Sequence, residues 1–218
     1  MAARHFLIPL AFAAISLASP ALAERAVMAP LPALSIAPTT NREVAIFAGG
    51  CFWGVEGVFE HVRGVSSAVS GYAGGDTRRP TYAAVSGGTT GHAEAVRVTF
   101  DPRVVRYSDL LRIYFSVVAD PTTLNYQGPD HGTQYRTALF PTSAAQEKQA
   151  RAYLAQLTRE RVFDRPIVTR IESLRGFTPA EAYHQDYMRR NPNAGYIVAN
   201  DRPKVEALRR LFPKSYRG

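Results

Sequence analysis

The sequence predicts a single α+β domain, and three observations support this prediction. Helix-like and strand-like patterns interleave from about residue 42 to residue 212, without a strict repeat or a G-x-G-x-x-G fingerprint. Apolar residues make up 46% of the chain and charged residues 20%, which allows a sizeable core and excludes intrinsic disorder. The length of 218 residues fits one domain with additional segments. We therefore expect a domain over residues 42–212 and a C-terminal tail over residues 213–218.

The N-terminal residues have the pattern of an export signal. Arg4 precedes an almost unbroken apolar run over residues 6–17, and Ala21-Leu22-Ala23 has the small-x-small spacing that a signal peptidase recognises. The run is shorter than the roughly 20 residues that a membrane-spanning helix needs. We expect a cleaved signal peptide over residues 1–23 and a mature protein exported to a bacterial periplasm, without stable membrane insertion. An uncleaved anchor is the alternative.

Residues 24–41 contain three prolines among small and apolar residues, and they are predicted to form a flexible tether. The apolar run 43–48 then predicts a buried strand that ends at two glycines, and apolar residues three and four apart predict a helix over 52–62. Residues 65–73 and 93–100 alternate, as strands do. In the second of these strands, Ala93, Ala95 and Arg97 face one side, and Glu94, Val96 and Val98 face the other.

The second half of the domain is predicted to contain two strands and four helices. Strands are expected at residues 135–140 and 167–173. Amphipathic spacing and capping residues predict helices at residues 108–118, 143–161, 178–189 and 205–211. Ser108 is the expected cap of the first of these helices, and Thr142 or Ser143 that of the second. The third is predicted from the capping box Thr178-Pro179-Ala180-Glu181, which has proline at the first helical position.

The chain is basic, with 26 Lys and Arg against 18 Asp and Glu, which gives a formal charge of +8. The basic residues are scattered and form no run of five or more. This distribution predicts a solvated basic surface rather than a nucleic-acid-binding protein.

Cys51 is the only cysteine in the sequence, so an intramolecular disulfide framework and a Cys-rich zinc site are excluded. It lies between a glycine pair and the start of a predicted helix. Backbone N–H groups and the helix dipole stabilise a thiolate there, and we expect its pKa to fall below the usual value of about 8.5. Phe52 and Trp53 are expected to form an apolar wall beside the sulfur. An inert, buried cysteine is the alternative to a nucleophile.

The octapeptide Gly49-Gly50-Cys51-Phe52-Trp53-Gly54-Val55-Glu56 resembles the signature of the A-type peptide methionine sulfoxide reductases. The resemblance extends from about Glu43 to Val205, in family order. Its further blocks are Gly71-Tyr72-Ala73-Gly74-Gly75, Pro80-Thr81-Tyr82, Gly91-His92-Ala93-Glu94-Ala95-Val96, Asp120-Pro121-Thr122-Thr123-Leu124-Asn125, Asp130-His131-Gly132-Thr133-Gln134-Tyr135-Arg136 and His184-Gln185-Asp186-Tyr187.

The resemblance implies a fold derived from the ferredoxin-like two-layer sandwich, with a mixed β-sheet flanked by helices. It also implies a monomer without bound metal or cofactor, which reduces the S-epimer of methionine sulfoxide, free or in peptides and oxidised proteins, as a repair enzyme. The family roles fall on the nucleophile Cys51, the acid Glu94, the oxygen-binding phenols Tyr82 and Tyr135, the methyl-binding wall of Phe52 and Trp53, and the substrate-orienting Asp130, His184 and Tyr187.

The chain departs from many members of that family because it has no second cysteine. Gly54, Ser86 and Ile197 stand where a second cysteine would be sought. Attack on a sulfoxide leaves a cysteine sulfenic acid, which must be reduced before the next turnover. We therefore expect an external thiol reductant, which is a thioredoxin-like or glutaredoxin-like protein or a small thiol.

Two other classes of function remain open from the residues alone. Cys51 with His92, His131 or His184 would suit a cysteine hydrolase or acyltransferase, provided that a histidine lies within hydrogen-bond reach of the sulfur. The last alternative is a non-catalytic binding module in which the thiol only packs. Isolated histidines are more often structural, and His92 and His131 are not included in the catalytic set.

Overall fold

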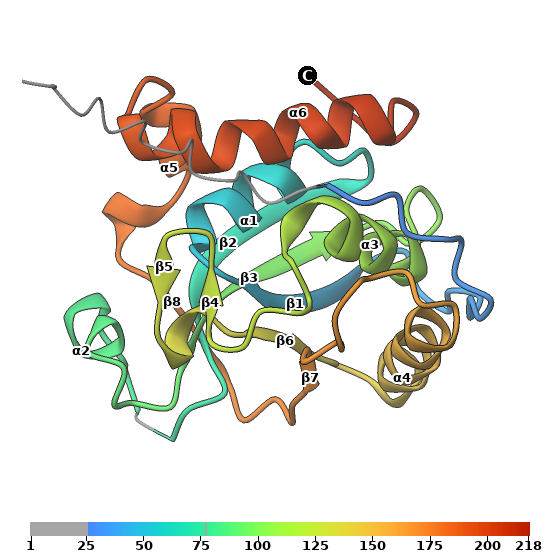
Figure 1. The fold of residues 1–218 in the computed structure, drawn as a ribbon, viewed down its shortest axis with the longest axis horizontal. Coiled ribbons are helices and arrows are strands. Elements are labelled where there is room, and N and C mark those ends of the chain that lie inside the picture. The colour runs from blue at the N-terminus through green and yellow to red at the C-terminus, as the bar shows by residue number, and fades with distance from the viewer. Residues whose placement is uncertain (1–25, 77) are drawn as a thin grey trace, which may run out of the picture.

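A six-stranded mixed sheet forms the centre of the structure, a computed structural model that describes residues 26–76 and 78–218 (Figure 1). The strand order is β7-β6-β1-β3-β2-β8, and only the β6–β7 pair is parallel. The strands of this sheet are β1 (Glu43–Gly49), β2 (Val65–Ala73), β3 (Ala93–Phe100), β6 (Thr137–Phe140), β7 (Arg170–Ile171) and β8 (Phe177–Pro179). A separate ribbon pairs β4 (Tyr126–Gln127) with β5 (Asp130–His131).

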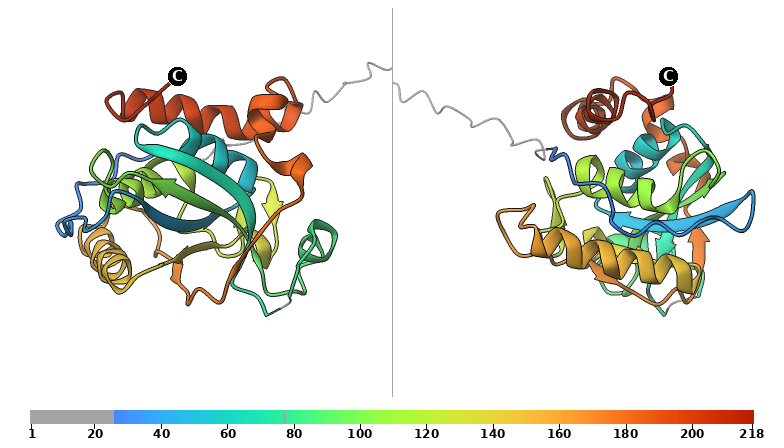
Figure 2. Two further views of the ribbon diagram at one scale, coloured as in Figure 1. Left: turned by 180° about the vertical axis from the view of Figure 1, so that it is seen from behind. Right: turned by 90° about the vertical axis from the view of Figure 1, so that its right-hand side faces the viewer.

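Helices cover one face of this sheet, which confirms the predicted α+β class with a mixed sheet. The α-helices are α1 (Phe52–Glu60), α2 (Tyr82–Ser86), α3 (Tyr107–Ile113), α4 (Ala144–Arg159), α5 (Tyr187–Arg190) and α6 (Arg202–Leu211). Two π-helical turns, η1 (Tyr114–Val118) and η4 (Ile197–Asp201), and two 3-10 turns, η2 (Thr133–Tyr135) and η3 (Ala182–His184), join them. α1 packs on β2 and β3, and α6 lies on the outer side of α1 (Figure 2).

The core follows from the alternation of the strand residues. In β1, Ala45 and Phe47 point into the large apolar cluster beneath the helices, whereas Ile46 and Ala48 belong to a smaller cluster on the opposite face. The Phe47 ring stacks on Phe59 of α1 at 4.9 Å between ring centroids. Burial of each such ring stabilises the fold by about 1.5–3 kcal/mol. This stacking holds α1 against the helix-covered face of the sheet.

Several elements are shorter than expected or begin elsewhere. The helix predicted over 108–118 begins at Tyr107 and ends in the π turn η1, and its cap is not Ser108, because Asp109 accepts a hydrogen bond from the Arg106 N–H at 3.0 Å. Only two residues of the predicted strand 167–173 pair with a neighbouring strand. The cap of α4 is confirmed, because the Ser143 hydroxyl accepts from the backbone of the first turn at 3.2 Å.

The prediction of a helix over residues 178–189 is wrong. Its first residues form β8, which pairs with β2. The carboxylate of Glu181, expected to cap a helix, instead accepts hydrogen bonds from the Tyr82 N–H at 2.9 Å and the Tyr72 hydroxyl at 2.8 Å. Pairing with a sheet edge and these long-range bonds outweigh the local capping preference. Helical structure is limited to η3 and the short α5.

Residues 26–41, here called the N-terminal strap, do not form the flexible tether that was predicted. Ala29 is completely buried, and the Tyr153 hydroxyl donates to the carbonyl of Pro30 at 2.7 Å. The side-chain oxygens of Gln156 and Gln149 accept from strap N–H groups at 2.8 and 3.1 Å. The strap has no internal hydrogen-bond pattern that sequence periodicity would reveal, and its partners lie on α4, α3 and η1, among them Gln156, Arg112 and Ser116. The predicted signal peptide, residues 1–23, lies outside the described residues.

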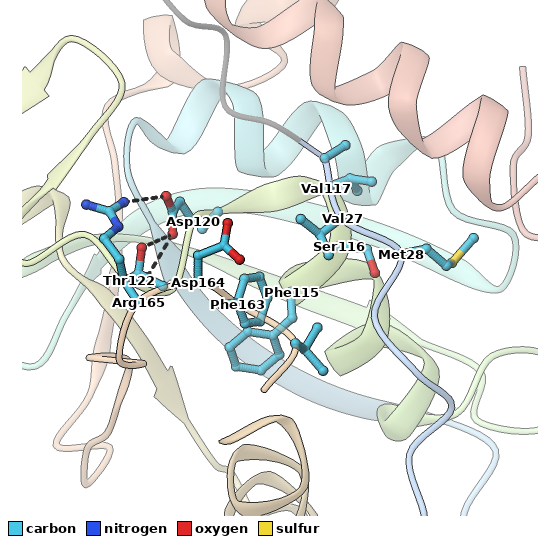
Figure 3. Close-up of a pocket in the computed structure, with 13 residues that line it drawn as sticks. Val27, Met28, Phe115, Ser116, Val117, Asp120, Thr122, Phe163, Asp164 and Arg165 are labelled. Atoms are coloured by element: carbon cyan, nitrogen blue, oxygen red, sulfur yellow. Dashed lines mark hydrogen bonds and ion pairs between the residues drawn. The ribbon is translucent and has the colours of Figure 1, made fainter. Parts of the chain in front are cut away.

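The C-terminal residues 213–218 also return to the domain, because the Arg63 N–H donates to the Ser215 carbonyl at 2.7 Å and Tyr216 stacks on His61 at 5.7 Å. A cavity of about 440 Å³ lies beneath the first residues of the strap, between Phe115, Phe163 and Arg165 (Figure 3). None of the predicted site residues lines this cavity. Across residues 26–76 and 78–218, no helix has the length and apolar character needed to cross a bilayer.

Candidate active site

Cys51 occupies the tight junction between β1 and α1. Gly50 before it has φ +86°, and a Cβ there would lie 2.6 Å from Cβ of Gln127, so both the turn and the close approach require glycine. The Phe52 N–H, the first of α1, donates to Oε2 of Glu94 at 3.0 Å. The residue that follows the sulfur-bearing Cys51 is therefore bound to a carboxyl group of β3.

The expected low pKa of Cys51 is wrong for the resting protein. Burial raises the pKa of the thiol well above its usual value, and the nearby carboxylates of Glu94 and Asp201 raise it further. A hydrogen bond from the Trp53 N–H acts in the opposite direction but does not compensate. The helix N-terminus is present, but burial and negative charge outweigh it. Cys51 is consequently a thiol near neutral pH.

Glu94 has the environment of a general acid. Its side chain is only 1% exposed, which excludes a solvent-facing strand residue. Burial raises its pKa to about 8; the Phe52 hydrogen bond lowers it, and the charges of Asp130 and Asp201 raise it. The carboxyl group is therefore largely protonated at neutral pH and can donate a proton.

The two predicted phenols, Tyr82 and Tyr135, both lie near Cys51 and Glu94. Tyr82 is fixed through its backbone to Glu181 and places its ring 6.5 Å from Phe52 and 4.4 Å from His184, between ring centroids. Burial raises the pKa of both Tyr82 and Tyr135, and the charges of Glu94 and Cys51 contribute to both shifts. Both hydroxyls therefore remain protonated and available as hydrogen-bond donors.

The aromatic wall is built around Trp53. Tyr187 stacks on the indole at 3.8 Å with an interplanar angle of 9°, and the indole N–H donates to Nδ1 of His184 at 3.1 Å. That donor requires Nδ1 to be unprotonated, and burial lowers the pKa of His184, so the ring is neutral. His184 also lies 5.0 Å from Phe52. The structure thus places the two expected wall residues, Phe52 and Trp53, against two of the expected substrate-orienting residues, His184 and Tyr187.

Asp130 joins this centre through a residue that the sequence analysis missed. The hydroxyl of Tyr196 donates to Oδ2 of Asp130 in a short hydrogen bond, and the Tyr196 ring meets Trp53 edge-on at 5.8 Å. Burial raises the pKa of Asp130, whereas the Tyr196 bond lowers it. No local pattern in the segment around Tyr196 identifies this hydroxyl from the sequence.

The histidines do not favour the hydrolase alternative. Nδ1 of His184 is already engaged by Trp53. His131 is exposed and stacks on Tyr126 at 5.2 Å. Nδ1 of His92 accepts from the Gly75 N–H at 3.3 Å. These contacts give structural roles to the histidines.

Possible metal ligands cluster elsewhere. Within the described ranges, the group of His, Cys, Asp and Glu side chains that lie close together is Glu56, Glu60 and Asp186. Ser70 donates to Glu56 at 2.9 Å, and burial raises the pKa of both Glu56 and Glu60 to about 7. This acidic cluster lies more than one helical turn along α1 from Cys51, and the proposed chemistry does not use it.

A lone thiol beside a protonated carboxyl, two phenols and an aromatic wall defines a thiol-dependent oxidoreductase. The sequence profile of the family described as "Peptide methionine sulfoxide reductase" matches residues 43–216. The chain belongs to this family and is an enzyme of its MsrA type, as the octapeptide indicated.

Similarity extends over most of the chain. The MsrA 2 protein of Mesorhizobium japonicum is 55% identical over 174 residues, which cover 80% of this chain and 89% of that protein. The MsrA of Deinococcus radiodurans is 54% identical over 80% of this chain and 84% of that protein. Among solved structures, reduced Mxr1 of Saccharomyces cerevisiae is 32% identical with a TM-score of 0.63, covering 74% and 92% of the two chains. Methionine sulfoxide reductase A of Corynebacterium diphtheriae is 33% identical with a TM-score of 0.61, covering 73% and 79%.

Proposed function

We propose that the protein reduces the S-epimer of methionine sulfoxide, free or in oxidised proteins, to methionine. The observation that carries the proposal is the bond from Phe52 to Glu94, which places a protonated carboxyl group beside the thiol of the preceding residue. A sulfoxide reduction needs this pair, because a nucleophile must reach sulfur while the oxygen receives a proton.

The reaction balances with groups of this chain. The Cys51 sulfur forms a bond to the sulfoxide sulfur, and Glu94 gives its proton to the oxygen. The protonated oxygen then moves to the Cys51 sulfur. The substrate S–O bond and the transient S–S bond break, the S–O bond of a cysteine sulfenic acid forms, and the substrate leaves as a thioether. The proton of the original thiol returns to the Glu94 carboxylate, so one methionine and one sulfenic acid form per enzyme.

Substrate orientation is assigned to the surrounding side chains. Tyr82 and Tyr135 donate hydrogen bonds to the sulfoxide oxygen, and Phe52 and Trp53 receive the methyl group. Asp130, His184 and Tyr187 hold the remainder of the substrate and fix the indole. Separate contacts for the oxygen and for the methyl group of a chiral sulfur support selectivity for one epimer.

Regeneration is assigned to an external thiol. Two equivalents of thiol convert the sulfenic acid into a thiol, a disulfide and water, without an internal disulfide. Cys51 is the only cysteine, Gly54 is packed against Asp201, and Ile197 is buried. The reductant is a thioredoxin-like or glutaredoxin-like protein, or a small thiol.

The location is proposed from residues 1–23, whose charged start, apolar run and small-x-small site match an export signal. We place the mature protein in the periplasm as a monomer that repairs oxidised proteins. Mass spectrometry of the secreted chain tests this through its N-terminus, which should begin at Glu24.

A stoichiometric assay tests the chemistry. Reduced enzyme is incubated with either epimer of methionine sulfoxide, with and without dithiothreitol. Without thiol, the S-epimer should give at most one methionine per enzyme and add one oxygen atom to Cys51; with thiol, methionine should accumulate. Cys51→Ser should give none while keeping the circular dichroism spectrum. A substrate-sized adduct on Cys51 would instead indicate an acyl-transfer enzyme, and product from the serine variant would refute the nucleophile.

A further inference from the structure

The side chain of Glu181 joins two elements that are distant in the chain, β2 and α2. Its Oε1 accepts from the Tyr82 N–H at 2.9 Å, and its Oε2 accepts from the Tyr72 hydroxyl at 2.8 Å. Tyr72 lies on β2 and is completely buried, so its hydroxyl is a fixed partner for the carboxylate. Because both oxygens are engaged, the carboxylate is held in one orientation against the start of α2.

Helix α2 depends on this contact, because it has only five residues. A helix of this length is not stable by itself in water. Tyr82 is its first residue, and the N–H groups of a first turn have no acceptor within the helix. The Thr81 hydroxyl accepts from the Ala84 N–H at 3.4 Å, whereas the Tyr82 N–H is bound by Glu181. A side chain 99 positions further along the chain therefore sets the position of the Tyr82 backbone.

The backbone of Glu181 holds the opposite side of the same centre. The His184 N–H donates to the Glu181 carbonyl at 2.9 Å, within the 3-10 turn η3. The rings of Tyr82 and His184 lie 4.4 Å apart, between centroids. Hydrogen bonds to one residue thus anchor the backbones that carry both of these rings.

We propose that Glu181 is a positioning residue of the reductase, whose carboxylate fixes Tyr82 so that the phenol hydroxyl meets the sulfoxide oxygen. The proposal rests on the proposed function, which assigns that oxygen to Tyr82 and Tyr135. Tyr135 lies on a different element, the turn η2, and its N–H donates to the Gly132 carbonyl at 3.0 Å. We therefore expect the Glu181 side chain to act on one of the two oxygen-binding phenols and not on the other.

Amide hydrogen exchange of the full-length protein, followed by NMR spectroscopy, tests the contact without any sulfoxide. The Tyr82 N–H should be protected in wild type and exchange about tenfold faster in Glu181→Ala, because it loses its acceptor. Glu181→Gln retains a side-chain oxygen and should restore most of the protection. Glu147→Ala is the matched control, because it removes a carboxylate that accepts two hydrogen bonds from Arg151 of α4 and should leave the Tyr82 N–H unchanged.

Single-turnover rates in two backgrounds separate positioning from a general loss of structure. In Tyr135→Phe, Tyr82 is the remaining oxygen-binding phenol, and addition of Glu181→Ala should slow methionine formation about tenfold or more. In Tyr82→Phe the hydroxyl that Glu181 positions is already absent, and the same addition should change the rate less than about twofold.

Equal slowing in both backgrounds would overturn the proposal. So would a Tyr82 N–H that exchanges freely in wild type, which is a measurement that needs no variant to fold. Failure of the proposed function would appear separately, as wild-type enzyme that forms no methionine while its Tyr82 N–H stays protected.

Discussion

The contact between Gly54 and Asp201 makes a stability prediction whose sign depends on the background. In an ordinary helix interior, Gly→Ala stabilises by about 1 kcal/mol. In this protein the new methyl group would lie 2.9 Å from Cγ of Asp201, well inside the roughly 3.5–4.0 Å of a normal carbon contact. Asp201 is only 1% exposed, so overpacking should cost about 1–3 kcal/mol. Gly54→Ala should therefore lower the free energy of unfolding by about 1 kcal/mol.

Removal of the obstacle should reverse this effect. In an Asp201→Ala background the nearest remaining atom of residue 201 is Cβ, at 3.4 Å, and Gly54→Ala should then be neutral or stabilising. Urea denaturation of the four proteins of the double-mutant cycle gives the coupling, expected at about 1–3 kcal/mol. Gly57→Ala is a useful control on the same helix, because it meets the flexible end of Met188 and should not couple to Asp201. Stabilisation by Gly54→Ala in both backgrounds would contradict the reasoning.

Three further predictions concern other parts of the molecule. The rate of sulfoxide reduction should fall as pH rises through about 8, because Glu94 loses its proton there. Glu94→Gln should slow single-turnover methionine formation about 10²–10⁴-fold. A smaller loss of rate at neutral pH would refute the acid role of Glu94. Glu56 has a pKa of about 7 in the folded protein against 4.5 in the unfolded chain, so it contributes about 3 kcal/mol to the free energy of unfolding below pH 4.5, and this contribution should be lost as pH rises through 7. In chemical denaturation at a series of pH values, Glu56→Gln should reduce this pH dependence of the free energy of unfolding. An unchanged pH dependence would exclude Glu56 as its source. Gln156→Ala removes the acceptor of the Ala33 N–H and the donor to the Leu31 carbonyl, which should destabilise the docked strap by about 1–3 kcal/mol. Limited proteolysis should then cleave the strap faster, while activity persists. Equal cleavage of variant and wild type would show that other contacts hold the strap.

Local patterns predicted the elements that bring the thiol and the acid together. The alternation of residues 93–100 placed Glu94 on the face of Val96 and Val98, and the structure keeps these three residues on the helix-covered side. The glycine pair before Cys51 correctly marked the turn into α1. These features are local, because each depends on neighbours within one strand or one turn.

The features that the sequence did not reveal depend on partners distant in the chain. Glu181 has the spacing of a helix cap, but its bonds to Tyr72 and Tyr82 exist only after β8 pairs with β2. The pKa of Cys51 was predicted from its own helix, whereas burial and carboxylates from other elements determine its direction. Asp201 lies 150 positions after Cys51, and nothing in its neighbours indicates that it packs on Gly54. Charges buried by tertiary packing cannot be located by periodicity.

If residues 1–23 act as the proposed export signal, the docked strap sets an order of events during export. The Val27 N–H donates to the Ser116 carbonyl at 3.0 Å, and Ala29 is fully enclosed only a few residues beyond the proposed cleavage point. A peptidase needs an extended stretch of chain on both sides of the bond that it cuts. Once the strap has docked, few residues on the C-terminal side of the proposed cleavage site remain extended for the peptidase to bind. Removal of the leader should therefore precede final folding, and a precursor that folds first would stay attached to the membrane.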